Sequence, residues 1–319
     1  MDMERGKLIT VVVPVYNRAE IVMRTLASIK AQRSEDFSLV IVDNASTDNS
    51  AEVLAEWVNA HSDSSFMPKL LTESTPGASA ARNRGLNAVT TPYVMFFDSD
   101  DEMRPTHIER IANHIKQFPE TEILRWNTST IDSDGWLITK DDHFHDEMQL
   151  HLMHSTLATQ RFVVRTDIIK SVNGWNESLS TFDDVDMGVR LVGTGSKIRK
   201  LNGEPTVLMH HSEECISGNS YSERTEEMDQ ALTCIETYLT DAERAEDLRI
   251  LNAKRAILAA HLKREKNESA SEKMLKKALN GVAAGDRKYI QAVYQTVKLF
   301  GKGGCFVALK LMGKKVEKR

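Results

Sequence analysis

Tyr93-Val94-Met95-Phe96-Phe97-Asp98-Ser99-Asp100-Asp101 is the stretch that decides the fold of this chain. Its apolar run predicts a strand buried on both faces, and three acids within four positions follow where the strand leaves its sheet. Carboxylates this close together repel one another, so a cation is expected beside them. Hard divalent ions such as Mg²⁺ or Mn²⁺ prefer carboxylate oxygen. The alternative is an acidic turn in which Asp101 caps the next helix, and the stretch alone favours that turn.

Three shorter apolar runs precede this strand and alternate with helical patterns. The runs are Leu8–Val13, Leu39–Val42 and Lys69–Thr72. Residues at helical spacing follow the first two, and a helix of small residues is expected over Ser79–Ala88 after the third. Pro14 is expected to end the first strand, and Ser46 or Thr47 to cap the helix after the second. This β-α-β-α order predicts an α/β fold with a Rossmann-like, mostly parallel central sheet flanked by helices.

Beyond the acids the pattern stays mixed to about residue 220 and is helical afterwards. The expected elements are a helix after Pro105, a strand at Ile123–Trp126, a hairpin turning at Asp134-Gly135, a surface loop over 140–151, an antiparallel strand within Thr156–Arg165, a turn at Asn173–Glu177, a helix from about Thr181 to Val192 and a strand at Thr206–Met209. We therefore predict an α/β domain over residues 1–220, and a helical C-terminal extension with a basic tail over 221–319.

Polar residues follow four of the expected strand ends. They are Pro14 to Arg18, Asp43, Gly77 with Arg82, and Asp98 to Asp101. In a parallel sheet these ends share one edge, which is where open α/β sheets bind ligands. An aromatic ring, carboxylates, a cation and metal ligands together suit a nucleoside diphosphate with its metal. The sequence has neither a Gly-x-x-x-x-Gly-Lys loop nor a Gly-x-Gly-x-x-Gly after a strand, so metal and arginine are expected to neutralise the phosphates.

Five segments, in order, resemble the family 2 glycosyltransferases, which have the GT-A fold. They are Val11–Asn17, Val42–Asp48, Gly77–Asn83, the Asp98–Asp101 segment as a DxD element, and Phe182–Asp184 with Arg190 behind it. The resemblance covers about residues 7–220. It implies an inverting, metal-dependent transfer of a sugar from a nucleotide-sugar donor, with a UDP-sugar expected. The acceptor would be a hydroxyl of a glycan or lipid-linked glycan in cell-surface polysaccharide synthesis.

The resemblance also implies roles for individual residues. The nucleotide-sugar site would comprise Pro14, Tyr16, Asn17, Asp43, Arg82, Asp98 and Ser99. The Mn²⁺ or Mg²⁺ ligands would be Asp100 and His211, with His210 as the alternative to His211. Asp184 would be the general base, with Asp183 as the alternative, and Trp175 and Glu177 would lie on the acceptor side. The sequence departs from the family pattern in two of these segments: Asp183 stands where the family usually has Glu, and Asn44-Ala45 replaces the commoner Asp-Gly.

The composition of the chain bears on its cellular location and on its partners. It has no signal-peptide pattern at its start, no apolar window approaching the roughly 20 residues of a membrane span, and three scattered cysteines, so a cytoplasmic location is expected. Thr296 to Arg319 holds seven Lys or Arg residues against one acid, in a chain of net charge −5. With apolar residues among the lysines, this tail predicts peripheral contact with the inner membrane face, against a solvated tail as the plain alternative. No nucleic-acid partner is expected.

Two other functions remain open at this stage. A nucleotidyltransferase on a similar sheet would need a basic, glycine-rich loop after the first strand, and Pro14-Val15-Tyr16-Asn17 is not such a loop. A catalytically inactive sugar-nucleotide-binding module would need none of the acids at positions 98, 100 and 184. The presence of all three favours the enzyme.

Overall fold

The computed structural model of the chain describes residues 6–63, 65–131, 137–139, 146–210 and 220–316. The chain divides into two compact units. The α/β unit comprises residues 1–141 and 156–212, and the helical unit comprises residues 142–155 and 213–319. The sequence did not indicate that a segment inside the first 220 residues joins the helical unit. The predicted boundary at residue 220 stays a prediction.

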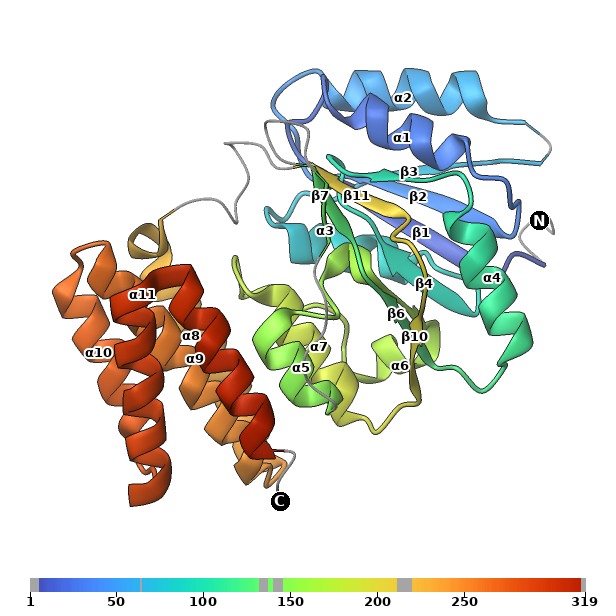
Figure 1. Cartoon of the computed structure of the whole chain (residues 1–319). Coiled ribbons are helices and arrows are strands. Elements are labelled where there is room, and N and C mark those ends of the chain that lie inside the picture. The colour runs from blue at the N-terminus through green and yellow to red at the C-terminus, as the bar shows by residue number, and fades with distance from the viewer. Residues whose placement is uncertain (1–5, 64, 132–136, 140–145, 211–219, 317–319) are drawn as a thin grey trace. The chain divides into compact units, whose positions relative to one another are not determined.

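The α/β unit is built on a large sheet that, among the described residues, has seven strands in the order β10-β6-β9-β4-β1-β2-β3 (Figure 1). These strands are β1 (Ile9–Val15), β2 (Phe37–Asp43), β3 (Lys69–Thr72), β4 (Tyr93–Phe96), β6 (Ile123–Trp126), β9 (Phe162–Arg165) and β10 (Ile198–Leu201). β4, β1, β2 and β3 are parallel neighbours, and β10 is parallel to β6. β9 runs antiparallel between β4 and β6. The predicted mostly parallel sheet is confirmed.

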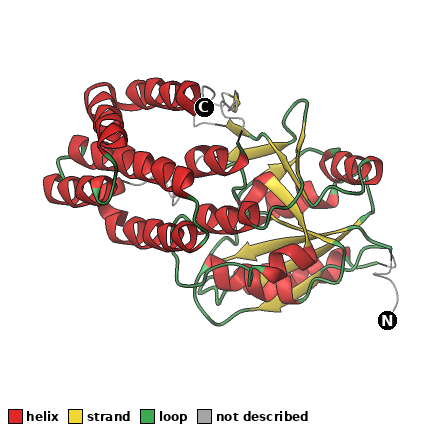
Figure 2. Cartoon of the chain, turned by 90° about the horizontal axis from the view of Figure 1, so that it is seen from below, coloured by secondary structure: helices red, strands yellow, loops and turns green. Residues whose placement is uncertain are grey.

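Helices cover both faces of this sheet (Figures 1 and 2). One face packs on α1 (Val22–Lys30), α2 (Ser50–His61) and α4 (His107–Gln117), and the other on α3 (Ala78–Asn87), α6 (Thr166–Ser171) and α7 (Asp183–Gly193). The alternation of side chains along β1 explains the two layers, because Val11 and Val13 join the core under α1 while Val12 joins the core under α3. Burying each valine on folding is worth about 1.5–3 kcal/mol. This is why a continuous run of β-branched residues forms a central strand.

A smaller sheet lies next to the acids that follow β4. Its four described strands, in the order β5-β11-β7-β8, are β5 (Glu102–Met103), β11 (Val207–His210), β7 (Ser129–Ile131) and β8 (Leu137–Thr139). β7 and β8 are antiparallel, as the hairpin prediction requires, although the turn at Asp134-Gly135 lies outside the described residues. β11 pairs antiparallel with β5, so the chain returns beside the acid segment some hundred residues later.

Two sequence expectations about where elements begin and end are wrong. Pro14 does not end the first strand, because β1 continues to Val15. The Val12 carbonyl accepts from the Phe97 amide, so residues 12 and 14 face β4, and β4 has already left the sheet at the level of Pro14. The missing N–H of proline therefore costs no ladder bond. Neither Ser46 nor Thr47 caps α2, whose N-cap is Asn49.

The helical unit contains α5 (Glu147–His154), α8 (Thr225–Asp241), α9 (Ala245–Arg264), α10 (Glu268–Leu279) and α11 (Ala284–Val316), with short 3-10 turns at Thr159–Arg161 in the α/β unit and at Tyr221–Arg224 here. α9 is its centre, because α5, α8, α10 and α11 all pack against it. The expectation of a loop over 140–151 is wrong for the residues that lie in α5. Gly301 kinks α11 with φ 56° and ψ −132°. Among the described residues, every helix is too short or too polar to cross a membrane.

Candidate active site

The register of the parallel strands brings the four predicted polar segments to one edge of the sheet. Val15 of β1 pairs with Asp43 of β2, which pairs in turn with Thr72 of β3. On the other side, the Phe97 amide donates to the Val12 carbonyl, so Asp98 follows β4 at the same edge. The loop after β1, the end of β2, the start of α3 and the acid segment are therefore neighbours, as the sequence predicts.

The loops after β1 and β2 are tied together by Asn17. Its Oδ1 accepts from the Thr47 amide at 2.8 Å, its Nδ2 donates to the Thr47 Oγ1 at 3.1 Å, and its own amide donates to the Ser46 Oγ at 3.1 Å. This explains why Ser46 and Thr47 do not cap α2. Asn17 has a positive φ of 49°, and its side chain stabilises the loop. Its neighbour Tyr16 is 55% exposed, so the phenol ring is available to a planar ligand.

Asp43 is a buried carboxylate with one oxygen unsatisfied. The side chain is 4% exposed, Oδ2 accepts from the Ser46 amide at 3.4 Å, and Oδ1 has no hydrogen-bond partner among the described residues. Leaving a buried acceptor without a partner costs about 1–3 kcal/mol. A donor on a bound ligand, such as the N–H of a nucleotide base, would remove that cost.

The departure at Asn44-Ala45 has a structural account. The Asn44 side chain donates to the Thr75 carbonyl at 2.7 Å and accepts from the Gly77 amide at 2.8 Å. It therefore holds the loop before α3 against the end of β2. Ala45 has a positive φ of 53°, the conformation that the family's usual glycine adopts without strain.

Arg82 lies at the centre of the site, only 6% exposed. Its Nη1 donates to Asp183 Oδ2 at 2.7 Å and its Nη2 donates to Asp98 Oδ1 at 3.0 Å, so one side chain joins two predicted site residues. Burial acts to lower the pKa of this guanidinium, but Asp183 and Asp98 outweigh burial, and the pKa is raised above its usual value. Arg82 is therefore a fixed cation between two acids.

Asp100 is a half-buried carboxylate whose surroundings favour a cation. Burial raises the pKa of Asp100 and the charge of Asp98 raises it further, while Arg18 and Arg24 lower it. A divalent ion would relieve this repulsion with the oxygen ligands that such ions prefer. Within the described residues, no group of three or more His, Cys, Asp or Glu side chains is arranged to hold a metal ion. The second expected ligand, His211, lies outside the described residues.

Asp101 does not cap the next helix, because the N-cap of α4 is Thr106. The buried Asp101 carboxyl accepts from the His210 amide at 2.9 Å and from the Gln160 side chain. Burial, and then Asp98 and Asp100, raise the pKa of Asp101 to about 8. The His210 ring bonds Glu102 Oε1 through Nε2 at 2.7 Å. Asp101 thus fixes the end of β11 beside the acid segment, a link that nothing in the sequence near Gln160 indicates.

The predicted base lies in the first turn of α7. Oδ1 of Asp184 accepts from the Val185 amide at 2.8 Å, and the side chain is half-buried. Asp183 Oδ2 is bound by Arg82 and also by the Ser79 hydroxyl at 3.2 Å. Arg190, further along α7, pairs with Asp186 at 2.6 Å. Of the three acids at this helix end, Asp183 and Asp186 are held by arginines.

The expectation that Trp175 lines the acceptor side is not supported. The indole is 2% exposed, with the Arg82 guanidinium 4.5 Å from its ring centroid and the Phe96 ring packed edge-on at 5.2 Å. Trp175 is therefore a packing residue beneath Arg82. Asn83 binds its amide and its carbonyl, at 2.8 and 2.9 Å, and also binds the exposed Glu177 at 2.7 Å. Sequence reasoning quoted Asn83 in a motif but gave it no role.

The two remaining predicted site residues, Pro14 and Ser99, are both buried. Pro14 is buried within β1, and Ser99 is buried in the acid segment.

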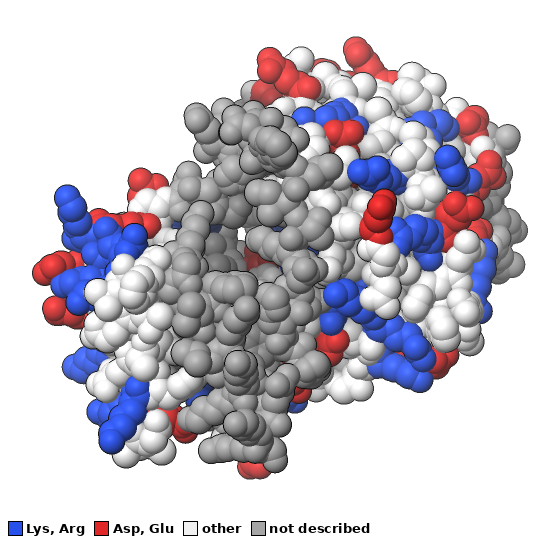
Figure 3. Space-filling model, viewed as in Figure 1, with Lys and Arg blue, Asp and Glu red and all other residues white. Residues whose placement is uncertain are grey.

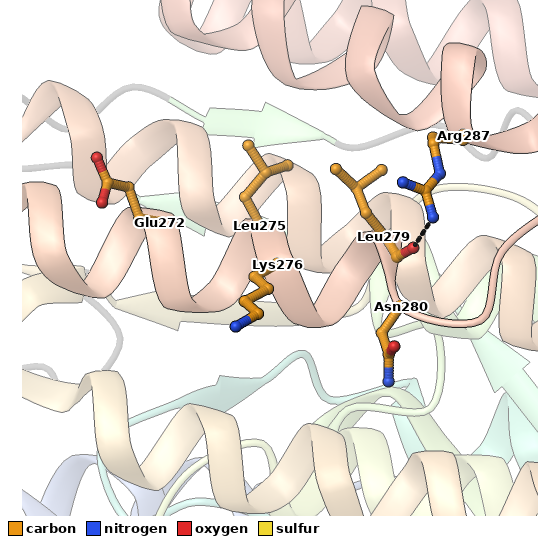
Figure 4. A pocket seen from close by; sticks show the side chains of 6 residues that line it. All are labelled: Glu272, Leu275, Lys276, Leu279, Asn280 and Arg287. Atoms are coloured by element: carbon orange, nitrogen blue, oxygen red, sulfur yellow. Dashed lines mark hydrogen bonds between the residues drawn. The ribbon is translucent and has the colours of Figure 1, made fainter.

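A hollow of about 460 Å³ lies in the helical unit and is lined by Glu272, Leu275, Lys276, Leu279, Asn280 and Arg287 (Figure 4). None of the motif residues lines it. On the face in Figure 3, acidic and basic side chains are interspersed over the described surface.

Comparison with known proteins places this arrangement in a family. Residues 10–168 match the family model described as glycosyl transferase family 2. The chain is 28% identical over 212 residues to the pre-mycofactocin glycosyltransferase of Mycobacterium tuberculosis, covering 64% of this chain and 42% of that protein. It is 29% identical over 185 residues to the teichoic acid poly(glycerol phosphate) polymerase of Staphylococcus epidermidis, covering 55% and 24%. The chain belongs to glycosyl transferase family 2.

Solved structures with the same fold extend the match along the chain. S. aureus TarS 1-349 in complex with UDP-GlcNAc superposes with a TM-score of 0.69 at 17% identity, over 98% of this chain and 92% of that one. The mannosyltransferase PcManGT of Pyrobaculum calidifontis, in complex with GDP-Man and Mn²⁺, superposes with a TM-score of 0.56 at 16% identity, over 97% and 86%. The fold is GT-A. The chain spans less than half the length of the two curated relatives named above.

Proposed function

We propose that this chain is a metal-dependent, inverting glycosyltransferase that moves a sugar from a UDP-sugar to a hydroxyl group of a glycan or lipid-linked glycan. One observation carries the proposal. Arg82 binds both Asp98 and Asp183, the acid that begins α7, at the C-terminal edge of the parallel strands, and Asp43 and Asp100 lie at the same edge. Family membership and the nucleotide-sugar complexes of TarS and PcManGT support a nucleotide-sugar donor.

The donor's base would lie between the exposed Tyr16 ring and the unsatisfied Asp43 oxygen. The phenol offers a flat apolar face and the carboxylate accepts from a base N–H. Asn17 would support this site by holding the loop after β1 to Thr47. Asp98, held by Arg82, would face the ribose or the sugar.

The donor-side chemistry calls for a divalent cation. Asp100 would hold Mn²⁺ or Mg²⁺, with His211 as the expected second protein ligand. When bound, the ion supplies positive charge that neutralises the diphosphate and the charge that develops on it as it leaves. Burial, and then the charge of Asp98, raise the pKa of Asp100, and a bound cation would offset both effects.

The acceptor hydroxyl would be activated by Asp184. Its carboxylate takes the hydroxyl proton as the acceptor oxygen forms a bond to the anomeric carbon. The bond from that carbon to the phosphate oxygen breaks in the same step, and the nucleoside diphosphate leaves with the electron pair. A single displacement of this kind inverts the anomeric centre. Asp183 is less suited to the task, because Arg82 and Ser79 both occupy its Oδ2.

A lipid-linked acceptor suits the part of α11 just before its kink at Gly301. Leu299 and Phe300 are 67% and 69% exposed, and the sequence that follows is rich in lysine. Together they favour peripheral contact with an anionic inner membrane face by a cytoplasmic enzyme. Changing Leu299 and Phe300 to Ser should reduce co-sedimentation with vesicles containing phosphatidylglycerol by about tenfold. Equal sedimentation of both forms would exclude this surface.

A thermal-shift screen tests the donor. Nucleotide sugars should raise the melting temperature only when Mn²⁺ is present, because binding to the native state stabilises it. Asp100→Asn should lose the metal-dependent shift. Asp184→Asn should keep the shift and lose transfer, as expected of a base outside the donor site. Transfer or donor hydrolysis that survives both changes would refute the mechanism. A shift without transfer in the wild type would favour the inactive binding module, and nucleotide transfer would favour the nucleotidyltransferase.

A further inference from the structure

Arg82 connects two carboxylates that belong to different parts of the proposed reaction. Asp98 follows β4 on the donor side, and Asp183 opens α7 next to the proposed base. The Arg82 nitrogens lie 3.0 Å from Asp98 Oδ1 and 2.7 Å from Asp183 Oδ2. The two terminal nitrogens of a guanidinium are held in one plane at a fixed spacing, so the position of each acid depends on the position of the other.

The guanidinium is itself held on its flat face. The Trp175 ring lies 4.5 Å from it, and Asn83, one residue further along α3, binds both the amide and the carbonyl of Trp175. Arg190 of α7 donates to the carbonyl of Gly174, the residue before Trp175, at 2.7 Å, so α7 also binds the turn that carries Trp175. The turn, α3 and α7 therefore form one connected frame around Arg82. Moving Arg82 would require moving Trp175.

The frame fixes where the first turn of α7 begins. Asp183 Oδ2 receives two hydrogen bonds from α3, one from Arg82 and one from Ser79. Asp184 is the next residue in the helix, so its side chain leaves the axis about 100° further round. Because Arg82 and Ser79 fix Asp183, the direction in which the Asp184 side chain leaves the helix is fixed as well.

We propose that Arg82 is a positioning residue for the transfer reaction: by holding Asp183 and Asp98 together, it sets the place of the Asp184 carboxylate relative to the donor. This inference rests on the proposed function. It also assigns Asp183 a positioning role, leaving Asp184 as the base. Arg82 then acts through Asp183, and its contribution to the rate should depend on that carboxylate.

A double-mutant cycle tests this dependence. Arg82→Lys keeps the charge but cannot bond two carboxylates at a fixed spacing, and Asp183→Asn removes the charge that Arg82 holds. Each single change should lower kcat by about a hundredfold, the cost of a misplaced reacting group. The double variant should lose no more than about threefold beyond either single variant, because both changes break the same contact. The donor KM of Asp183→Asn should change by less than about threefold, since the base acts on the acceptor, whereas Arg82→Lys also releases Asp98 and should raise the donor KM more.

The controls separate positioning from folding and from donor binding. Arg84→Lys, an exposed position on the same helix, should leave kcat within about twofold. If Arg82→Lys does not fold, Ser79→Ala removes the other bond to Asp183 and should lower kcat several-fold in the wild type but not in Asp183→Asn. Losses that multiply in the double variant would overturn the inference. A large rise in donor KM at unchanged kcat would overturn it as well, because Arg82 would then be a donor ligand.

The failure of the inference can be told apart from the failure of the proposed function. An active wild type with multiplicative losses overturns the role of Arg82 alone. A wild type that transfers no sugar from any nucleotide donor overturns the proposed function, and this inference with it.

Discussion

His107 should make the α/β unit sensitive to acid. The side chain is fully buried at the start of α4, with Nδ1 2.7 Å from the Thr206 hydroxyl and the ring packed edge-on against Trp126. Burial, and then the charge of Arg110, lower the pKa of His107 to about 3. The unfolded chain has an ordinary histidine, with a pKa of about 6.5. Between these two values the unfolded state binds a proton that the folded state does not, so stability falls as the pH falls.

The magnitude follows from the two pKa values. At pH 7.5 neither state is protonated and the effect is close to zero. A pH of 5.0 lies about 1.5 units below the pKa of the histidine in the unfolded chain. Proton binding therefore stabilises the unfolded state, and lowers the free energy of unfolding, by about 2 kcal/mol. Carboxyl groups also titrate in this range, so the effect of His107 has to be isolated by a variant. His107→Asn keeps a polar atom near Thr206 and removes the titration.

The assay is urea unfolding followed by tryptophan fluorescence. All four tryptophans belong to the α/β unit, so the signal reports on that unit. Wild type should be more stable than His107→Asn at pH 7.5, because the variant leaves a cavity beside Trp126. That advantage should shrink by about 2 kcal/mol at pH 5.0. A difference that stays constant with pH would refute the reasoning. His61→Asn, at the half-buried C-terminal end of α2 where the ring stacks on Trp57, controls for replacing a histidine.

Two further pairs of variants test the packing of α3 and the hydrogen bonds of Asp101. Gly85→Ala should lower stability by about 1–3 kcal/mol, because a Cβ there would lie 2.3 Å from Val12 Cγ1. Gly285→Ala, where a Cβ would meet nothing within 4 Å, should be neutral or stabilising when both glycine variants are measured by thermal unfolding. Asp101→Ala should cost about 1–3 kcal/mol in urea unfolding by leaving the half-buried His210 amide without its partner, whereas Asp101→Asn should cost less than half of that. Equal losses from the two Asp101 variants would show that the hydrogen bond does not matter.

The sequence predicts the large sheet well because its central strands are continuous apolar runs. β10 was missed because Ile198-Arg199-Lys200-Leu201 is an edge strand, half-buried throughout, and has no such run. α6 was missed because its six residues are too few for a helical period to show. Pro14 misled the prediction of where β1 ends, since the neighbouring strand stops first and this cannot be known from β1 alone.

The site was predicted as a set of residues but not as a set of contacts. The choice between Asp183 and Asp184 depends on a hydrogen bond from Arg82, which is 101 positions away in the sequence. Trp175 could equally be a platform for a sugar or a packing residue until the Arg82 guanidinium is found on its ring. Residue type and order carry information about chemistry. The fold determines which hydrogen-bond partner each side-chain atom has, and these partners determine the role of each residue.

The place of α5 has a consequence for how the chain is made. Met148, Leu150 and Leu152 of α5 are buried, α9 packs on this helix, and Lys254 donates to the Leu152 carbonyl at 2.7 Å. A ribosome releases α5 before any of these partners exists. At roughly 5–20 residues per second, α5 would wait about 5–20 seconds for α9 to emerge, with its apolar side chains exposed meanwhile. A chain cut after residue 212 would never cover them, so removing the C-terminal part should yield an aggregating protein rather than a smaller enzyme.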